Sequence, residues 1–255
     1  MLLLGGVKVL KHGSPGNTDN VGSSDFLKYN GVNLFAAKEL VERATEQLGF
    51  AYTEALDQKY KHIHVQTHEV AGLAHMNDII GPVTHPANPR LLKKKIIGIN
   101  HLVTPERVAQ AYRIMNQKGI TNLERGLFVR GFAETGYNGG IDEVSVMPGG
   151  TLVSELNKGQ IRTYHLTAKD FGLEEITKEE LSPGIKKAEV SKAILANEIY
   201  GGMRSSALVN TAIIFYLTDG LDLIEGTKKA DTLLSSGRPL EILLEYAKMS
   251  RGENV

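Results

Sequence analysis

The chain has 255 residues, enough to bury the core of one large domain or two modest ones. It contains no cysteine, which excludes disulfides, thiolate metal sites and thiol nucleophiles and fits a reducing compartment. Lysine plus arginine and aspartate plus glutamate both number 29, so no overall field favours nucleic acid or a basic partner.

The N-terminal part is predicted to begin with a strand. The apolar start "MLLLGG" lacks a preceding basic region and is far shorter than a signal core or a spanning helix, so we expect a buried strand in a cytoplasmic protein. Because a domain seldom begins directly in a core strand, we also expect further sequence upstream. The segment "GGVKVLKHG" continues as strand then loop, and Pro15 and Gly16 suit the centre of a type II turn.

Helices and strands alternate from there to the middle of the chain. Ser23 or Ser24 is expected to cap a short helix closed by Gly31, and residues 36–48 have apolar side chains at helical spacing. Thr104 and the proline and glutamate after it open the clearest helix, "PERVAQAYRIMNQKG". A buried strand "RGLFVRG" follows, and "TLVSEL" and "QIRTYHL" form a hairpin.

The last third, from about Ser182, is predicted to be helical in four segments: "KKAEVSKAILANEIYGG", "SALVNTAIIFYLTDG", "IEGTKKADTLLSSG" and "PLEILLEYAKM". No repeat, low-complexity tract or linker divides the chain. We therefore expect a single α/β domain over residues 1–255, with a mostly parallel sheet, an antiparallel hairpin and flanking helices.

Two loops carry chemistry suited to one site, since open α/β sheets bind ligands beyond the carboxyl ends of their strands. The first loop, residues 10–27, brings Lys11 and His12 off a strand, is rich in glycine, and places Ser23 and Ser24 at a helix start. Free amides, hydroxyls and a cation favour an anionic ligand, phosphate above all. The alternative is that the serines only cap a helix and the lysine is a solvated charge.

The second loop is "NGGIDEVSVMPGG", in which Asp142 and Glu143 are neighbours. Successive side chains of a regular strand point to opposite faces, so the two acids can serve one site only if the backbone is irregular, which Gly139 and Gly140 permit. Such a pair suits Mg²⁺, which prefers hard oxygen ligands and often combines one or two carboxylates with substrate phosphates. The alternative is a solvated turn.

Two further clusters have residue types that could form sites. Six of the eight histidines fall between His62 and His101, and His64 and His68 are spaced to share a helix face, but no HExxH pattern appears, so surface histidines are favoured over zinc. The basic run "RLLKKK", residues 90–95, has no aromatic stacking partners, which favours a solvated face over a nucleic-acid contact.

Six segments, in one order over nearly the whole chain, resemble a known family: "GGVKVLKHG" with "GSSDFLKYNGVNL", "IIGPVTHPANP", "GGIDEVS", "TLVSELNKGQIRTYHLTAKDFGL", "LVNTAIIFYLTDG" and "IEGTKKADTLLSSGRPLEIL". They are similar to motifs of the anthranilate phosphoribosyltransferases, which share a fold with the pyrimidine nucleoside phosphorylases. Six matches in the family's order make chance similarity a poor explanation.

The resemblance implies an enzyme of tryptophan biosynthesis that transfers phosphoribose from phosphoribosyl pyrophosphate (PRPP) to an aromatic amine and releases pyrophosphate. It implies that Asp142 and Glu143 hold Mg²⁺ on the diphosphate. It also implies that the PRPP site is lined by Lys11, Gly13, Ser23 and Ser24, with His12 and Ser14 nearer the acceptor. Mg²⁺ and amides can stabilise a departing diphosphate without a protein nucleophile, and no general base stands out.

Three departures from the family pattern matter. The family's N-terminal helical part and its Gly-Thr-Gly-Gly-Asp loop have no counterpart in this sequence, and because dimerisation in the family relies largely on those helices, a homo-oligomer stays open. Ala74 aligns with the arginine near the anthranilate carboxylate, and Ser14 with an asparagine. A buried carboxylate without a cationic partner is costly, so we expect little transfer to anthranilate itself.

A rival hypothesis keeps the scaffold and drops catalysis. In it the chain binds a nucleotide or nucleic acid through Lys11, the basic run and Arg204. Fold alone does not separate the two hypotheses.

Overall fold

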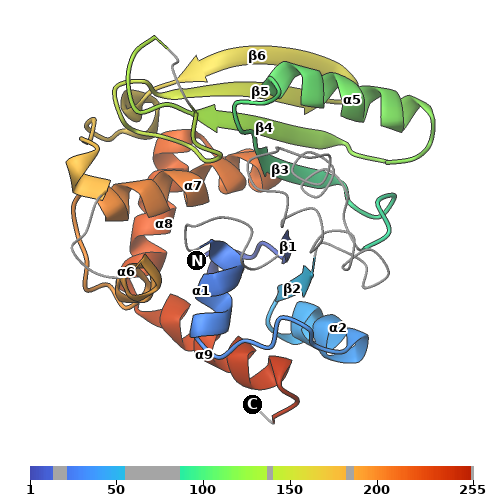
Figure 1. The fold of residues 1–255 in the computed structure, drawn as a ribbon, viewed down its shortest axis with the longest axis vertical. Helices are drawn as coiled ribbons and strands as arrows, with labels where there is room; N and C mark the ends of the chain where they lie inside the picture. Colours follow the sequence, from blue (N-terminus) through green and yellow to red (C-terminus); the bar gives the residue numbers. More distant parts are fainter. Residues whose placement is uncertain (14–21, 55–86, 137–139, 182–186, 254–255) are drawn as a thin grey trace, which may run out of the picture.

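A computed structural model describes residues 1–13, 22–54, 87–136, 140–181 and 187–253. Its strands form two sheets, seen one above the other in Figure 1. β1 (Val9–Gly13) and β2 (Phe50–Glu54) form a parallel pair. The second sheet has the order β3 (Lys94–Gly98), β4 (Arg125–Gly131), β5 (Thr151–Asn157) and β6 (Gln160–Leu166), parallel between β3 and β4 and antiparallel after that.

Helices cover both sheets and make up the C-terminal region. The described α-helices are α1 (Ser23–Tyr29), α2 (Lys38–Gln47), α5 (Pro105–Gln117), α6 (Lys187–Leu195), α7 (Gly202–Asp219), α8 (Leu223–Ser235) and α9 (Arg238–Ser250). Short 3₁₀ turns span Leu3–Gly5, Ala168–Phe171 and Glu179–Leu181. The α/β class, with parallel pairing, an antiparallel hairpin and a helical C-terminal third, is confirmed.

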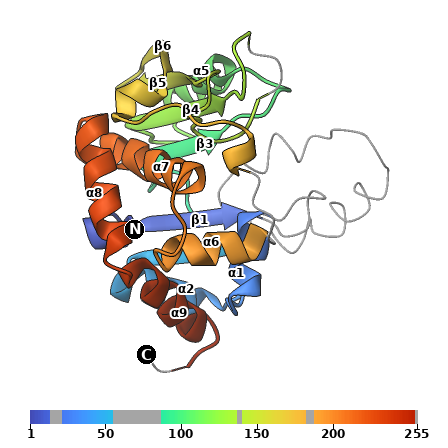
Figure 2. The ribbon, with the colours of Figure 1, turned by 90° about the vertical axis from the view of Figure 1, so that its left-hand side faces the viewer.

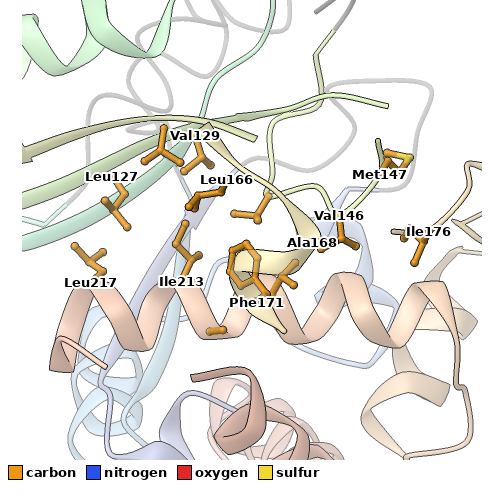
Figure 3. Close-up of a cluster of buried hydrophobic side chains, with 14 residues drawn as sticks. Leu127, Val129, Val146, Met147, Leu166, Ala168, Phe171, Ile176, Ile213 and Leu217 are labelled. Carbon is orange, nitrogen blue, oxygen red and sulfur yellow. The ribbon is translucent and has the colours of Figure 1, made fainter. Parts of the chain in front are cut away.

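The four-stranded sheet lies between two helices, with α5 on one face and α7 on the other (Figure 1). β4 is buried on both faces, so it reads as a continuous apolar run and not as an alternating one. Phe128 packs toward α5 beside Tyr112, whereas Leu127 and Val129 face α7. In Figure 3 the α7 side chains Ile213 and Leu217 point at that face of the sheet.

The two-stranded sheet belongs to a second cluster at the other end of the molecule, with α1, α2, α6 and α9 around it (Figure 2). Tyr52 of β2 and Tyr246 of α9 are both 1 % exposed and form its centre. Apolar contacts between α7 and α8 join the two parts. Among the described residues no single helix is long and apolar enough to cross a membrane, and the bent pair α7 and α8 qualifies only when both helices are taken together.

The elements with strong local signals form as predicted. The hydroxyl of Thr104 accepts a hydrogen bond from the amide of Arg107 at 3.3 Å and so caps α5. β5 and β6 are joined by Lys158 and Gly159, whose φ values of 47° and 83° form the left-handed two-residue turn that hairpins favour.

Two N-terminal predictions are wrong. The start is a 3₁₀ turn and not a strand, because the Gly5 amide bonds back to the Leu2 carbonyl at 3.0 Å and Gly6 has a φ of 87°, outside the strand region. Neither Ser23 nor Ser24 caps α1, since the helix begins at Ser23 itself and Gly22 precedes it.

The apolar run after the acid pair forms no strand. Ile141 makes one isolated antiparallel bridge to Gly131, and no described strand includes residues 142–147. Val144, Val146 and Met147 are buried all the same, against α7 and the 3₁₀ turn Ala168–Phe171. They anchor an irregular loop.

Candidate functional site

The acid loop, residues 140–150, lies directly on the carboxyl ends of β3 and β4. A Cβ atom on Gly98, the last residue of β3, would lie 1.7 Å from the carbonyl oxygen of Asp142. A Cβ on Gly131, the last residue of β4, would lie 2.5 Å from that of Glu143. Only glycine at both strand ends allows this approach, and it brings the two acids to the edge where α/β sheets bind ligands.

The backbone of the acid loop is held on both sides of the two acids. Gly131 and Ile141 exchange two hydrogen bonds of 2.9 Å. On the other side, both main-chain groups of Val144 bond to the side chain of Asn210 in α7, each at 3.0 Å. The side chains of Asp142 and Glu143 are exposed at a bend, as the prediction of an irregular backbone required.

Lys11 connects the two predicted loops. It lies in β1, and its pKa is lowered by burial while the negative charge of Asp142 acts in the opposite direction. The lysine of the first loop and an acid of the second, 131 positions apart in sequence, therefore interact electrostatically in the fold. His12 follows in β1 and is half-buried.

Gly13 ends β1 and rests on two buried hydroxyl groups. The Tyr52 hydroxyl donates to the Gly13 carbonyl at 2.6 Å and is 2.9 Å from the Ser24 oxygen. Burial raises the pKa of Tyr52 to about 12, with the Ser24 hydrogen bond opposing it, so the phenol stays a donor at neutral pH. Ser23 is exposed and Ser24 is 3 % exposed, so the two serines face different surroundings.

Several residues named in the sequence predictions lie outside the described residues. They are Ser14, Ala74, Gly139, the turn at Pro15 and Gly16, and the histidines at positions 62, 64 and 68. The remaining predicted ligand-binding residues are described. Tyr52 and Asn210 support the two loops from distant elements. No sequence pattern indicates Tyr52. Asn210 stands in the family-like segment "LVNTAIIFYLTDG", but nothing in that segment indicates its contact with the acid loop.

Arg204 and the three lysines of the basic run, which the rival hypothesis named, are engaged within the fold. Arg204 is 9 % exposed and bonds to Asp231 at 2.7 Å and to Asn197 and Ser235. In the basic run, Lys93 forms an ion pair with Glu124. Lys94 donates to the carbonyl of Thr218 in α7. Lys95 lies over the ring of Tyr112.

The donor set fits Mg²⁺ better than a metal held by protein alone. Among the described residues no three histidine or acidic side chains gather as a ready metal cage. Two neighbouring exposed carboxylates on a fixed backbone offer hard oxygens and leave coordination positions for water and phosphate, which is the usual arrangement for Mg²⁺.

Comparison with known proteins identifies the family. The profile of the glycosyl transferase family, a/b domain, matches residues 3–240. The anthranilate phosphoribosyltransferase of Nitrosospira multiformis is 31 % identical over 98 % of this chain, which spans 69 % of that protein's length. The anthranilate phosphoribosyltransferase of Shewanella denitrificans is 29 % identical over 97 % of this chain, which spans 65 % of that protein's length.

Solved structures agree with this assignment. The anthranilate phosphoribosyltransferase of Thermus thermophilus matches 97 % of this chain and 70 % of its own, with 28 % identity and a TM-score of 0.78. The Saccharomyces cerevisiae enzyme in complex with PRPP and Mg shares the fold at 21 % identity over 98 % of this chain and 68 % of its own, with a TM-score of 0.77. The chain belongs to the anthranilate phosphoribosyltransferase family, within the glycosyl transferases of the a/b-domain type.

Proposed function

We propose that this chain is a Mg²⁺-dependent phosphoribosyltransferase that acts in the cytoplasm and transfers phosphoribose from PRPP to a small aromatic amine. Family membership supports the reaction class. The observation that carries the proposal for this chain is the close approach of the acid loop to Gly98 and Gly131, because it brings two neighbouring carboxylates to the carboxyl ends of β3 and β4, where α/β sheets bind ligands.

The first loop supplies the donor-binding groups. The amine of Lys11, the main chain at Gly13 and the hydroxyl and amide of Ser23 offer polar groups that suit the phosphates of PRPP. Because α1 has only seven residues, these groups and not a helix dipole carry the attraction. On the buried side, Ser24 is hydrogen-bonded to the Tyr52 hydroxyl, which donates to the Gly13 carbonyl. His12 and Ser14 are proposed to lie toward the acceptor.

The second loop supplies the metal-binding groups, Asp142 and Glu143. Mg²⁺ held there would stabilise the negative charge that a departing diphosphate accumulates. The residues of the chain then need only bind and orient the donor, because a leaving group stabilised in this way can depart without a protein nucleophile.

The acceptor is proposed to be an aromatic amine other than anthranilate. The prediction follows from Ala74, which stands where the resemblance expects an arginine. A lost charge-assisted hydrogen bond is worth roughly 1.5–3 kcal/mol, or about ten- to a hundredfold in affinity. Restoring the cation with Ala74→Arg is expected to raise transfer to anthranilate, and efficient transfer by the unaltered protein would contradict the prediction.

The rival hypothesis of a non-catalytic nucleic-acid binder has less support. Arg204 and the three lysines of the basic run, on which it partly relied, are engaged in contacts within the fold. Titration with DNA at two salt concentrations tests it, since binding through phosphates weakens steeply as salt rises.

Calorimetry with PRPP tests the proposed function. The protein is expected to bind PRPP more tightly with Mg²⁺ than without, and the double variant Asp142→Asn with Glu143→Gln is expected to lose this difference and keep its fold. A matched control is Glu39→Gln with Glu46→Gln, the same charge change on the exposed face of α2. Equal PRPP affinity with and without Mg²⁺ in the unaltered protein would refute the proposal.

A further inference from the structure

We propose that Asn210 is a positioning residue for the metal-binding acids, an inference that rests on the proposed function. It lies in α7, 66 positions from the loop that it contacts. It makes no hydrogen bond to either acid; it acts through the backbone of Val144, the residue that follows Glu143.

The contact fixes both the position and the rotation of one peptide segment. The Val144 amide donates to Oδ1 of Asn210, and Nδ2 of Asn210 donates to the Val144 carbonyl, both at 3.0 Å. This is the two-bond pattern that one strand residue makes with a paired strand residue. Val144 lies in no strand and its side chain is 1 % exposed, so its backbone groups need such a partner.

The amide of Asn210 is itself held in one orientation. Its Nδ2 also donates to the carbonyl of Ser206, one turn earlier in α7, at 3.0 Å. Because the Asn210 side chain is hydrogen-bonded to its own helix as well as to Val144, it keeps the loop at a fixed position relative to α7. α7 is in turn packed against β3 and β4, the strands whose ends the acid loop covers.

The consequence for the acids is geometric. The paired hydrogen bonds between Gly131 and Ile141 fix the residue before Asp142, and Asn210 fixes the residue after Glu143. Only the two exposed acids lie between these anchors, so the anchors set their Cα positions. Groups that orient metal ligands in this way typically matter by roughly 10- to 100-fold in metal affinity.

A purely structural explanation competes with this one. Ser145 is also anchored, through its amide to Thr151 at 2.8 Å and through its hydroxyl to the Phe132 carbonyl at 2.9 Å. If those bonds fix the loop alone, Asn210 contributes stability and nothing to the acids. The two explanations differ in what happens to PRPP binding when Asn210 is replaced.

Three variants separate the explanations. Asn210→Leu has nearly the same shape and removes all three hydrogen bonds, and Asn210→Asp keeps the acceptor for the Val144 amide but loses the donor. Thr211→Val is the matched control, because it removes a buried hydroxyl that bonds to the Ala207 carbonyl of the same helix and leaves the loop untouched. Thermal unfolding measures the structural cost of each.

The first measurement is amide hydrogen exchange of the segment 141–146, which needs no ligand. Asn210→Leu is expected to speed exchange there by about tenfold or more while β5 and β6 keep their protection. Thr211→Val is expected to leave the segment unchanged. Unaltered exchange at Val144 in Asn210→Leu would overturn the proposal whatever the protein binds.

The second measurement is the ratio of PRPP affinities with and without Mg²⁺. Asn210→Leu is expected to reduce that ratio by roughly 10- to 100-fold, Asn210→Asp to lie between it and the unaltered protein, and Thr211→Val to keep it. A preserved ratio in Asn210→Leu, despite faster exchange, would overturn the positioning role. Equal PRPP affinities with and without Mg²⁺ in the unaltered protein would refute the proposed function and the metal role together. The hydrogen-exchange result would still decide whether Asn210 holds the loop.

Discussion

Replacing Gly98 by alanine should disturb the acid loop, although it adds only a methyl group. It ends β3, and a Cβ atom there would lie 1.7 Å from the Asp142 carbonyl oxygen, 2.5 Å from its carbonyl carbon and 2.9 Å from its Cβ. The first two of these atoms are main chain and cannot rotate away. Gly98→Ala therefore has to move the acid loop or the end of the strand.

The size of the movement follows from that distance. Bringing the oxygen from 1.7 Å to the 3.0 Å below which such contacts essentially never occur requires a shift of more than 1 Å. Overpacking of this kind costs roughly 1–3 kcal/mol, which corresponds to a fall in Tm of about 2–12 °C for a domain of this size. A misplacement of about 1 Å can cost on the order of a hundredfold in a catalytic site.

Thermal unfolding and PRPP calorimetry with Mg²⁺ test this together. Gly98→Ala is expected to lower Tm and to weaken Mg²⁺-dependent binding by about tenfold or more. The control is Gly226→Ala in α8, where the new Cβ would meet Ala212 at 3.1 Å and a few tenths of an ångström of relaxation suffice. If Gly98→Ala melts like the unaltered protein and binds PRPP equally well, the loop does not rest on this strand end and the reasoning is wrong.

Three other predictions concern stability. Glu155→Gln leaves Arg125 half-buried without its ion-pair partner at 2.7 Å and is expected to cost about 3–5 kcal/mol in a denaturant titration, whereas Glu241→Gln, in an exposed ion pair, should change stability by less than about 1 kcal/mol. Burial lowers the pKa of Lys95 to about 8, below its unfolded value, so the unfolded state binds more protons above pH 8 and the stability of the protein rises with pH there. The variant Lys95→Met should therefore be more stable than the unaltered protein at pH 7, and this advantage should shrink between about pH 8 and 10. A difference in stability that stays constant with pH would contradict this. Lys158→Asn relieves a φ of 47° in the hairpin turn and is expected to raise Tm by about 1–4 °C, so a lower Tm would count against the turn geometry.

Elements with local signals could be predicted from sequence alone. Thr104 caps α5 and Lys158 with Gly159 turns the hairpin because the residues that decide each structure are neighbours in the chain. The N-terminal start could not be predicted in this way. It lies against Phe215 of α7, and Lys229 of α8 donates to the Gly5 carbonyl at 3.0 Å, so contacts more than 200 positions away decide its conformation.

In the candidate site, too, features set by local sequence could be predicted and features set by distant contacts could not. That Asp142 and Glu143 need an irregular backbone follows from the alternation of strand side chains, and the bend there agrees. That the loop rests on Gly98 does not follow from any pattern, because a glycine at a strand end has many uses. Asn210 belongs to the family-like segment "LVNTAIIFYLTDG", but the next residue, Thr211, is polar too, so no local pattern marks Asn210 as the partner of the acid loop.

Tyr52 and Tyr246 connect α9, through hydrogen bonds, to the end of β1 where the first loop begins. The Tyr52 amide donates to the Tyr246 hydroxyl at 2.7 Å, and the Tyr52 hydroxyl donates to Gly13 at 2.6 Å. Two aromatic rings thus connect α9 to a segment more than 230 positions earlier. Trimming α9, fusing a rigid partner to it or opening the chain between α8 and α9 would therefore disturb ligand binding from the far end of the sequence, while the same alterations at the β5–β6 turn would leave that connection intact.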